Sequence, residues 1–223
     1  MNISNDKIFY KNNKLGKPII LWARSRMFDL FMTKMKPNYN SKIIDVGVSS
    51  KNNAVANYLE KNYPWQKNIS CVGLGNKHSF KRIFPGIKYY KIEANKRLPF
   101  ADNQFDIAFS NAVIEHVGGA KERIFYISEM LRISREVFIT VPNRWFPVEH
   151  HTSIPLLHFC PYLFRRLLQH TSLFRWANPK LLDFISKKDI LREWPEINQP
   201  ELIYCGLKFS IFSSNIAIVL KKN

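Results

Sequence analysis

Acidic side chains are scarce in this chain of 223 residues. Its 17 aspartate and glutamate residues stand against 34 lysine and arginine residues, which gives a formal net charge of +17. This surplus argues against a cationic partner for the whole surface and favours anionic ones, such as RNA, acidic lipid head groups or phosphorylated substrates. The basic residues are spread along the chain, however, so lysines scattered over a solvated surface explain the charge equally well.

Cysteines and long apolar runs are also few. Cys71, Cys160 and Cys205 are odd in number, far apart and without metal-ligand spacing. They argue against a disulfide framework and predict buried or neutral thiols in a reducing compartment. No run approaches the roughly 20 apolar residues of a membrane span. The first 14 residues are polar, unlike a secretory signal. We therefore expect a cytoplasmic protein.

Glycine is scarce at the place where a nucleotide cofactor would need it. The stretch KIIDVGVSS (42–50) runs from a short apolar strand into a turn that holds one glycine, Gly47. Nucleotide-cofactor loops usually carry two or three glycines here. Gly47 would still let the backbone approach a ligand, and Asp45 would repel a pyrophosphate and attract a cation. A plain turn between a strand and a helix is the alternative interpretation.

Apolar runs alternate with helical periodicities along the chain. Because strands alternate with helices, we predict an α/β fold: a doubly wound, mostly parallel, seven-stranded sheet with helices on both faces. Ligands of such sheets bind beyond the carboxyl ends of the strands. The predicted strands are 43–46, 70–74, 88–92, 105–110, 137–141, 201–209 and 215–220, and the predicted helices are 19–35, 53–61, 122–133 and 186–194.

Composition divides the chain into regions. We expect residues 1–40 to form an N-terminal arm and a basic helix, and residues 41–223 to form the main domain. Within it, residues 145–185 are rich in aromatic residues, histidine and proline, and predict a helical, aromatic lid after the fifth strand. The lid segment IPLLHFCPYLFRRLLQH (154–170) either packs on the core or touches acidic lipid.

The stretch RLPFADNQFDIAFSNAVIEHV (97–117) carries the most specific motif. It resembles the class I S-adenosylmethionine (SAM)-dependent methyltransferases, especially the broad group that acts on small molecules, quinones and glycans. In that family L-P-F-x-D-x-x-F-D is followed by a strand and then by E-H-V. The resemblance covers residues 40–145 by sequence and 186–220 by topology. The matching positions are Leu98, Pro99, Phe100, Asp102, Phe105, Asp106, Asn111, Glu115, His116 and Val117.

The resemblance implies a Rossmann-like fold with SAM as the cofactor. SAM carries a sulfonium and an ammonium but no phosphate, so an acidic residue beside the glycine suits it. By analogy with the family, Asp45 would serve the methionine ammonium, and Gly47 with Val48 would give the close backbone approach. The adenine would lie near residues that follow the third strand, and the methionyl part near residues that follow the fourth: Glu93 or Asn95, and Asn111 with Ala112.

Three positions depart from the family pattern. Glycines expected at Ser49 and Lys51 are missing, and the second strand ends in Leu74, Gly75 and Asn76 without the acid that holds the ribose. Asn76 would bind the ribose through neutral hydrogen bonds instead. Loss of one charge-assisted bond costs about 1.5–3 kcal/mol, so SAM affinity would fall roughly tenfold to a hundredfold.

Methyl transfer from a sulfonium is an in-line displacement, so the protein must position the acceptor and, for a hydroxyl, remove its proton. The candidate bases are His116 and, after the fifth strand, Glu149, His150 and His151. We favour His151 over His150, with Glu149 as its orienting partner. A structural imidazole at 116 and a solvated loop at 149–151 are the alternatives. Adjacent histidines point apart and no third ligand is evident, so no metal site is predicted.

The sequence thus predicts a SAM-dependent methyltransferase. Its acceptor would be a hydroxyl or amine on a small, glycan-type or lipid-linked molecule, with peripheral contact to the inner membrane face left open. An RNA methyltransferase is the first rival: the charge favours it, but SNAV (110–113) stands where base-amino methyltransferases carry an NPPY-like tetrad. A non-catalytic binding protein with a degenerate pocket is the second, suggested by Ser49, Lys51 and Gly75.

Overall fold

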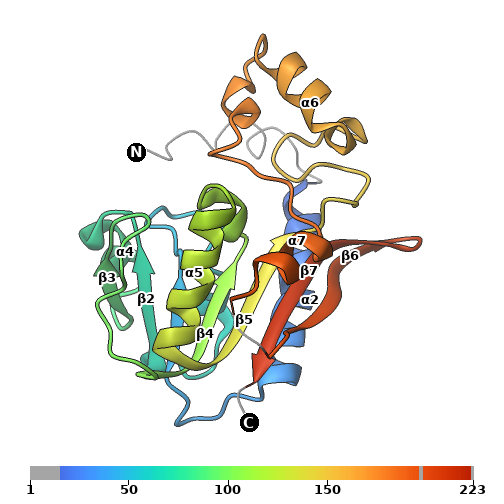
Figure 1. Ribbon diagram of the computed structural model, residues 1–223. Helices are drawn as coiled ribbons and strands as arrows, with labels where there is room; N and C mark the ends of the chain where they lie inside the picture. The colour runs from blue at the N-terminus through green and yellow to red at the C-terminus, as the bar shows by residue number, and fades with distance from the viewer. Residues whose placement is uncertain (1–15, 196–197, 222–223) are drawn as a thin grey trace.

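The computed structural model describes residues 16–195 and 198–221, and they fold around one seven-stranded sheet (Figure 1). The strand order is β3-β2-β1-β4-β5-β7-β6. Strands β1 to β5 run parallel, and β7 lies antiparallel between β5 and β6. The predicted fold class is confirmed. The strands are β1 (Ile43–Val46), β2 (Ile69–Gly73), β3 (Lys88–Lys91), β4 (Phe105–Asn111), β5 (Ser134–Pro142), β6 (Glu201–Phe209) and β7 (Phe212–Lys221).

Helices cover both faces of the sheet. One face carries α2 (Gly16–Met35), α3 (Tyr58–Asn62) and α4 (Lys77–Ile83), and the other carries α5 (Ala120–Ile133) and α7 (Lys187–Glu193). The central strands are apolar on both sides because each face must pack against helices. The 3₁₀ helix η1 (Gln66–Asn68) leads into β2.

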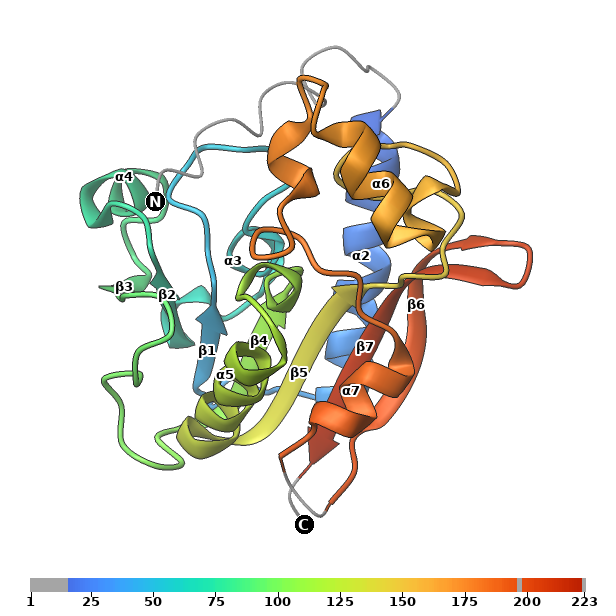
Figure 2. The same ribbon diagram turned by 45° about the horizontal axis from the view of Figure 1, so that its top comes forward.

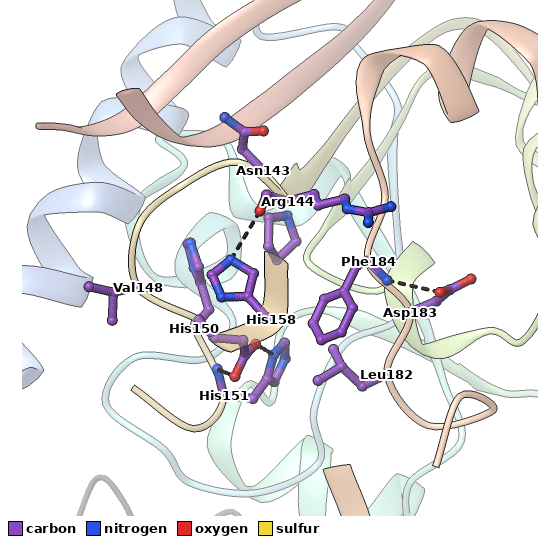
Figure 3. Close-up of a pocket in the computed structure, with 11 residues that line it drawn as sticks. Asn143, Arg144, Val148, His150, His151, His158, Leu182, Asp183 and Phe184 are labelled. Atoms are coloured by element: carbon purple, nitrogen blue, oxygen red, sulfur yellow. Dashed lines mark hydrogen bonds and ion pairs between the residues drawn. The ribbon is translucent and has the colours of Figure 1, made fainter. Parts of the chain in front are cut away.

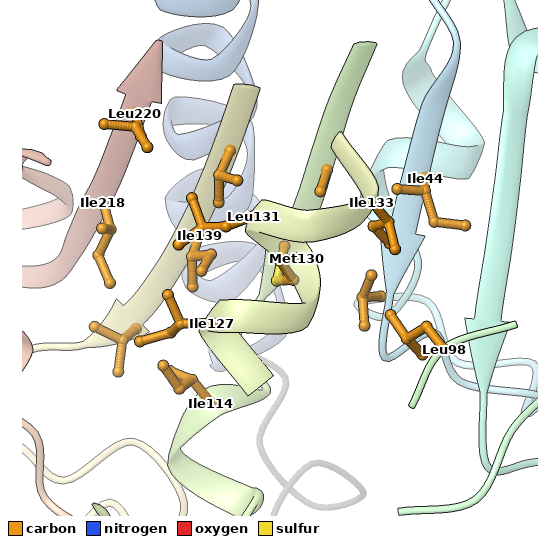
Figure 4. Packing of buried hydrophobic residues seen from close by; sticks show 14 of the residues in the cluster. Ile44, Leu98, Ile114, Ile127, Met130, Leu131, Ile133, Ile139, Ile218 and Leu220 are labelled. Atoms are coloured by element: carbon orange, nitrogen blue, oxygen red, sulfur yellow. The ribbon is translucent and has the colours of Figure 1, made fainter. Parts of the chain in front are cut away.

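Alternate residues of one strand enter different cores. In β4, Ile107 and Phe109 face the core beneath α2, whereas Ala108 faces the core beneath α5. On that second side, Ile127 and Met130 of α5 pack onto the sheet (Figure 4). The two cores together hold the carboxyl ends of the strands in fixed register.

Helix α2 packs firmly on the sheet. Its Phe31 ring meets Phe109 and Phe138 edge-on, at centroid distances of 5.1 and 5.4 Å. The predicted arm over 1–15 lies outside the described residues. Within 16–195 and 198–221, no helix combines the length and the apolar character that crossing a membrane would need.

Some details of the prediction are wrong. Residues 53–57 are not helical, because Asn57 locks a loop: its side chain accepts the Ser49 N–H at 2.9 Å and donates to the Ser49 carbonyl at 2.7 Å. Helical spacing within 122–133 places Ile124 with Ile127 and Met130 on the inward side, but Ile124 lies on the surface.

The lid (residues 145–185) stands beyond the carboxyl ends of the parallel strands (Figures 1 and 2). It contains η3 (Leu157–Phe159), α6 (Pro161–Leu168) and η4 (Phe174–Ala177). Phe164 and Leu168 form a small core of their own with Ala177 and Leu182. The lid is therefore a packed unit that covers the carboxyl ends of the parallel strands, where ligands of this fold class bind.

Candidate active site

Asp45, the third residue of β1, is buried beside the carboxyl group of Glu60 from α3. Burial raises the pKa of Asp45 well above its ordinary value and Glu60 adds to the rise, while Arg24 opposes it. Burial also raises the pKa of Glu60, whose Oε1 accepts a hydrogen bond from Cys71 Sγ at 3.1 Å. The two carboxyl groups therefore retain a proton that a cation placed beside them would displace.

Gly47 lies in the turn that follows β1. Its φ angle is +107°, and a Cβ built there would approach Cγ2 of Val113 to 2.5 Å. Backbone strain and this close approach both require glycine. The N–H groups of Gly47 and Val48 donate to the Val72 carbonyl at 2.9 and 3.1 Å. The turn is thus fastened to β2 and held against the segment that follows β4.

The end of β2 also has a close backbone approach, at Gly75. A Cβ on Gly75 would collide with the hydroxyl of Ser50, and Tyr89 donates its hydroxyl hydrogen to the Gly75 carbonyl at 2.9 Å. Asn76 caps α4, because its Oδ1 accepts the Ser79 N–H at 3.0 Å. The amide oxygen of Asn76, a residue predicted to bind the ribose, therefore caps a helix. The amide N–H groups of Asn76 are the part of the side chain that remains for a ribose.

The remaining predicted cofactor residues occupy the same edge of the sheet. Asn111 ends β4 and accepts a hydrogen bond from Thr140 Oγ1 at 2.8 Å. Ala112 follows with a φ angle of +57° and donates its N–H to the Thr140 carbonyl. Glu93 and Asn95 are exposed after β3, two strands away from β1.

A second group of polar side chains, the histidine cluster, consists of Glu115, His116, Glu149 and His151. Glu115 and His116 belong to η2 (Ile114–His116) after β4, and Glu149 and His151 lie in the lid after β5. Nδ1 of His151 lies 2.9 Å from Oε1 of Glu149, and Nε2 of His151 lies 3.1 Å from Nε2 of His116. Nδ1 of His116 lies 2.6 Å from the Leu181 carbonyl. Because β4 and β5 are neighbours in the sheet, residues 35 positions apart meet.

The charges in the histidine cluster follow from burial and contacts. Burial opposes ionisation of Glu149, but hydrogen bonds from His151 and Thr152 outweigh it and lower the pKa of Glu149 to about 2. Burial, helped by His151, lowers the pKa of His116 to about 4. Burial raises the pKa of Glu115 to about 7. At neutral pH, Glu149 is therefore ionised and the His116 ring is neutral.

Aromatic side chains of the lid enclose this cluster. The Trp176 ring lies 6.1 Å from the His116 ring and 4.7 Å from the His151 ring, centroid to centroid. A cavity of about 20 Å³ next to the cluster is lined by His150, His151, His158 and Phe184, among others (Figure 3). A space of this size holds about one water molecule and is too small for an acceptor.

Comparison with known proteins decides the family. The sequence model of a family described as "Methyltransferase domain" matches residues 38–136. Residues 38–136 of the chain are therefore a methyltransferase domain. None of the curated proteins is a match by sequence to this methyltransferase.

Solved structures share its fold at low sequence identity. A SAM-dependent methyltransferase from Aquifex aeolicus is 11% identical, with a TM-score of 0.54, over 96% of this chain and 97% of that one. One from Methanosarcina mazei is 14% identical, with a TM-score of 0.53, over 86% and 96%. A structure named as a Zn-dependent alcohol dehydrogenase, from Rhodobacter sphaeroides, is 10% identical with a TM-score of 0.58 over 87% and 88%. These similarities show the fold, and the methyltransferase assignment comes from the family model over residues 38–136.

The residues after β1 and β4 suit the methionine end of SAM. The buried carboxyl groups of Asp45 and Glu60 match an ammonium. The space beside Gly47 is filled by the Val113 side chain, so this glycine serves the packing of the turn. The ribose end is less well provided, because no carboxylate follows β2 and Ser50 packs on Gly75. The structure therefore suits the positively charged methionine end of SAM better than its ribose end.

Much of the family motif supports the site from a distance. Asp106 accepts the Lys42 N–H at 2.8 Å and so anchors the start of β1. Asp102 pairs with Arg132 at 2.9 Å, at the end of α5. Only Asn111, Glu115 and His116 of the motif positions lie in the two groups of side chains described above. Most residues of the family motif thus stabilise the fold and do not belong to the site.

Sequence reasoning missed several residues of the site. Glu60 lies in a short helix in which nothing but its burial distinguishes it from the exposed Lys61. Arg24 comes from a distant segment, the helix α2, and reaches the site through tertiary packing. Glu115 was quoted as a motif position without a role, although an acid directly before a candidate base was a usable signal.

Proton release on cofactor binding tests the Asp45–Glu60 pair. The pKa of Asp45 is raised in the free protein, and an ammonium beside it would lower that pKa, so binding displaces a proton. We expect calorimetry of SAM in buffers of different ionisation enthalpy to show release of up to about one proton at neutral pH, with affinity rising as pH rises. Equal heats in all buffers would show that Asp45 does not receive the charge.

Proposed function

We propose that this methyltransferase methylates a hydroxyl or amine of a small, glycan-type or lipid-linked acceptor that binds against the histidine cluster. The observation that supports this most is the His116–His151 contact, with Nε2 atoms 3.1 Å apart at the carboxyl edge of the sheet. SAM supplies the activated methyl group. The chain must position the acceptor and take up its proton.

Hydrogen bonding fixes which nitrogens of the two rings carry hydrogen. The Leu181 carbonyl can only accept, so Nδ1 of His116 is the donor. The ionised carboxylate of Glu149 likewise accepts from Nδ1 of His151. When both rings are neutral, their Nε2 atoms therefore present two lone pairs to one another.

Two lone pairs held face to face attract a cation. In the proposed reaction this cation is the proton of the acceptor, which leaves the hydroxyl or amine and is held between the two Nε2 atoms. Glu149 orients the His151 ring and balances the positive charge that forms, as a carboxylate beside a catalytic imidazole does. His151, His116 and Glu149 are thus the proposed catalytic group.

The surface of the lid favours a lipid-linked acceptor. On α6, Tyr162 is 72% exposed, and Leu163 and Leu167 are also exposed. Phe174 joins them from η4, and Arg166 lies on the same helix. Apolar side chains beside basic ones suit the boundary between acyl chains and acidic head groups. We therefore propose that the lid contacts an anionic membrane surface when the acceptor is taken up.

Vesicle sedimentation tests the acceptor side. The double variant Leu163→Asp/Leu167→Asp should bind vesicles that contain phosphatidylglycerol at least about tenfold more weakly than the wild type, because two apolar contacts become repulsive charges. Ile124→Asp, which changes an equally apolar exposed residue of α5, is the matched control and should bind as the wild type does.

Methyl transfer from radiolabelled SAM is measured in parallel on a lipid extract and on its water-soluble counterpart. The proposal predicts labelled product in the lipid fraction, and loss of that labelling in the lid variant. Labelling confined to soluble molecules, with the lid variant fully active, would contradict the lipid-linked acceptor while leaving methyl transfer itself intact.

A further inference from the structure

Glu115 is a buried carboxyl group in the histidine cluster. Its side chain is 1% exposed, and neither carboxylate oxygen has a hydrogen-bond partner among the described residues. A buried carboxyl group without a partner is costly, and native structures rarely keep one without a reason. Its Oε1 lies 3.9 Å from Nε2 of His116, the same nitrogen that faces His151.

Three potential ligand atoms therefore meet at one point. One atom from each of Glu115, His116 and His151 lies within 4.8 Å of the other two. We infer that these three residues form a binding site for one divalent transition-metal ion, such as Zn²⁺. No metal site was predicted from the sequence, because only the adjacent pair His150 and His151 was considered; the fold instead brings His151 to His116.

The spacing of the two imidazoles suits a shared ion. Two nitrogens at about 2.1 Å from a metal, at angles between octahedral and tetrahedral, lie about 2.9–3.4 Å apart. The Nε2 atoms of His116 and His151 are 3.1 Å apart. The Glu115 oxygen lies 3.9 Å from His116 Nε2, and the three ligand atoms lie within 4.8 Å of one another. The Glu115 side chain must therefore move by about 0.5–1.5 Å to reach the same range from both nitrogens.

The surroundings hold the ligands as outer partners of metal sites do. Ligand histidines usually donate their second N–H to a carboxylate or a backbone carbonyl. His151 donates to Glu149, and His116 donates to the Leu181 carbonyl. Arg24 acts as a positive group on Glu115, and Arg175 acts as one on His116.

The role of the ion rests on the proposed function. Two imidazoles and one carboxylate leave coordination positions open, and a metal-bound hydroxyl loses its proton far more readily than a free one. A metal ion and a proton are alternative occupants of the same two lone pairs. His151 is needed in both cases, so binding of the metal, rather than the reaction rate, is what distinguishes them.

Metal titration of the full-length protein tests the inference directly. The chain is freed of metal with a chelator and titrated with Zn²⁺ by calorimetry, and bound zinc is counted after dialysis. We expect the wild type to bind one ion in this site with micromolar or tighter affinity, and Glu115→Gln and His151→Gln to weaken it at least about tenfold. His170→Gln, which changes an exposed histidine of the lid, should bind as the wild type does.

Circular dichroism shows whether each variant is folded, and Glu149→Gln serves as a further variant that keeps all three ligands but releases the His151 ring. It should also weaken Zn²⁺ binding. Co²⁺ should give the absorption bands of a protein-bound ion in the wild type and lose them in His151→Gln. No binding at 100 µM Zn²⁺, or equal binding by every variant, would overturn the inference. Methyl transfer by the chelated wild type reports separately on the proposed function.

Discussion

Asp45→Asn is expected to abolish SAM binding at micromolar concentrations while the chain stays folded. Asp45 is the buried carboxyl group at the end of β1, and asparagine keeps its shape but cannot become an anion. Removing one partner of a buried charged pair costs about 2–5 kcal/mol, which corresponds to roughly 30-fold to several-thousand-fold in affinity. The substitution also removes the repulsion between Asp45 and Glu60, so folding should not suffer.

Calorimetry with SAM and with its demethylated product, S-adenosylhomocysteine, measures this loss. Asp102→Asn is the matched control, because Asp102 is an exposed aspartate that pairs with Arg132 away from the carboxyl ends of the strands. Its affinity for SAM should equal that of the wild type. If Asp45→Asn bound SAM with unchanged affinity, the cofactor would have to sit elsewhere.

His151→Gln is expected to lower kcat about 10²- to 10⁴-fold, the usual contribution of a group that handles a proton in the transition state. His151 makes the link between Glu149 and His116, at 2.9 and 3.1 Å. Glutamine retains hydrogen-bonding atoms but cannot hold a proton or an ion as an imidazole does. The affinity for SAM should stay within about threefold of the wild type, since the buried carboxyl groups at β1 are untouched.

Steady-state kinetics with separate measurement of SAM binding distinguishes this role from a structural one. His170→Gln, in the exposed part of the lid, should keep the wild-type kcat. Equal loss of SAM affinity and kcat in His151→Gln would indicate a disturbed fold. An unchanged kcat would remove the histidine cluster from the reaction.

The sheet was predictable because its central strands are short, mainly apolar runs buried on both faces. Ile43 and Ile44, for example, face opposite cores and are both fully buried. The loop at 47–57 was not predictable from periodicity. Val55, Tyr58 and Leu59 have helical spacing, but the two bonds between Asn57 and Ser49 fix an irregular path before α3 begins.

The site was predictable residue by residue but not as an arrangement. Strand-end positions pointed to Asp45, Gly47 and His116, and an acid close to a histidine pointed to Glu149 with His151. The contact between His116 and His151 depends on the pairing of β4 with β5 and on the fold of the lid, which no local pattern encodes. The raised pKa values of Asp45 and Glu60 likewise arise from burial, which sequence spacing does not reveal.

Cofactor placement is the claim on which the other proposals depend, and a crystal structure with S-adenosylhomocysteine tests it most directly. The account predicts density for the ligand beyond the carboxyl ends of β1, β2 and β4, with its amino group beside Asp45 and its backbone contact at Gly47. Ligand density at another edge of the sheet, or Ser50 still packed on Gly75 with no ligand beside it at saturating concentration, would contradict it.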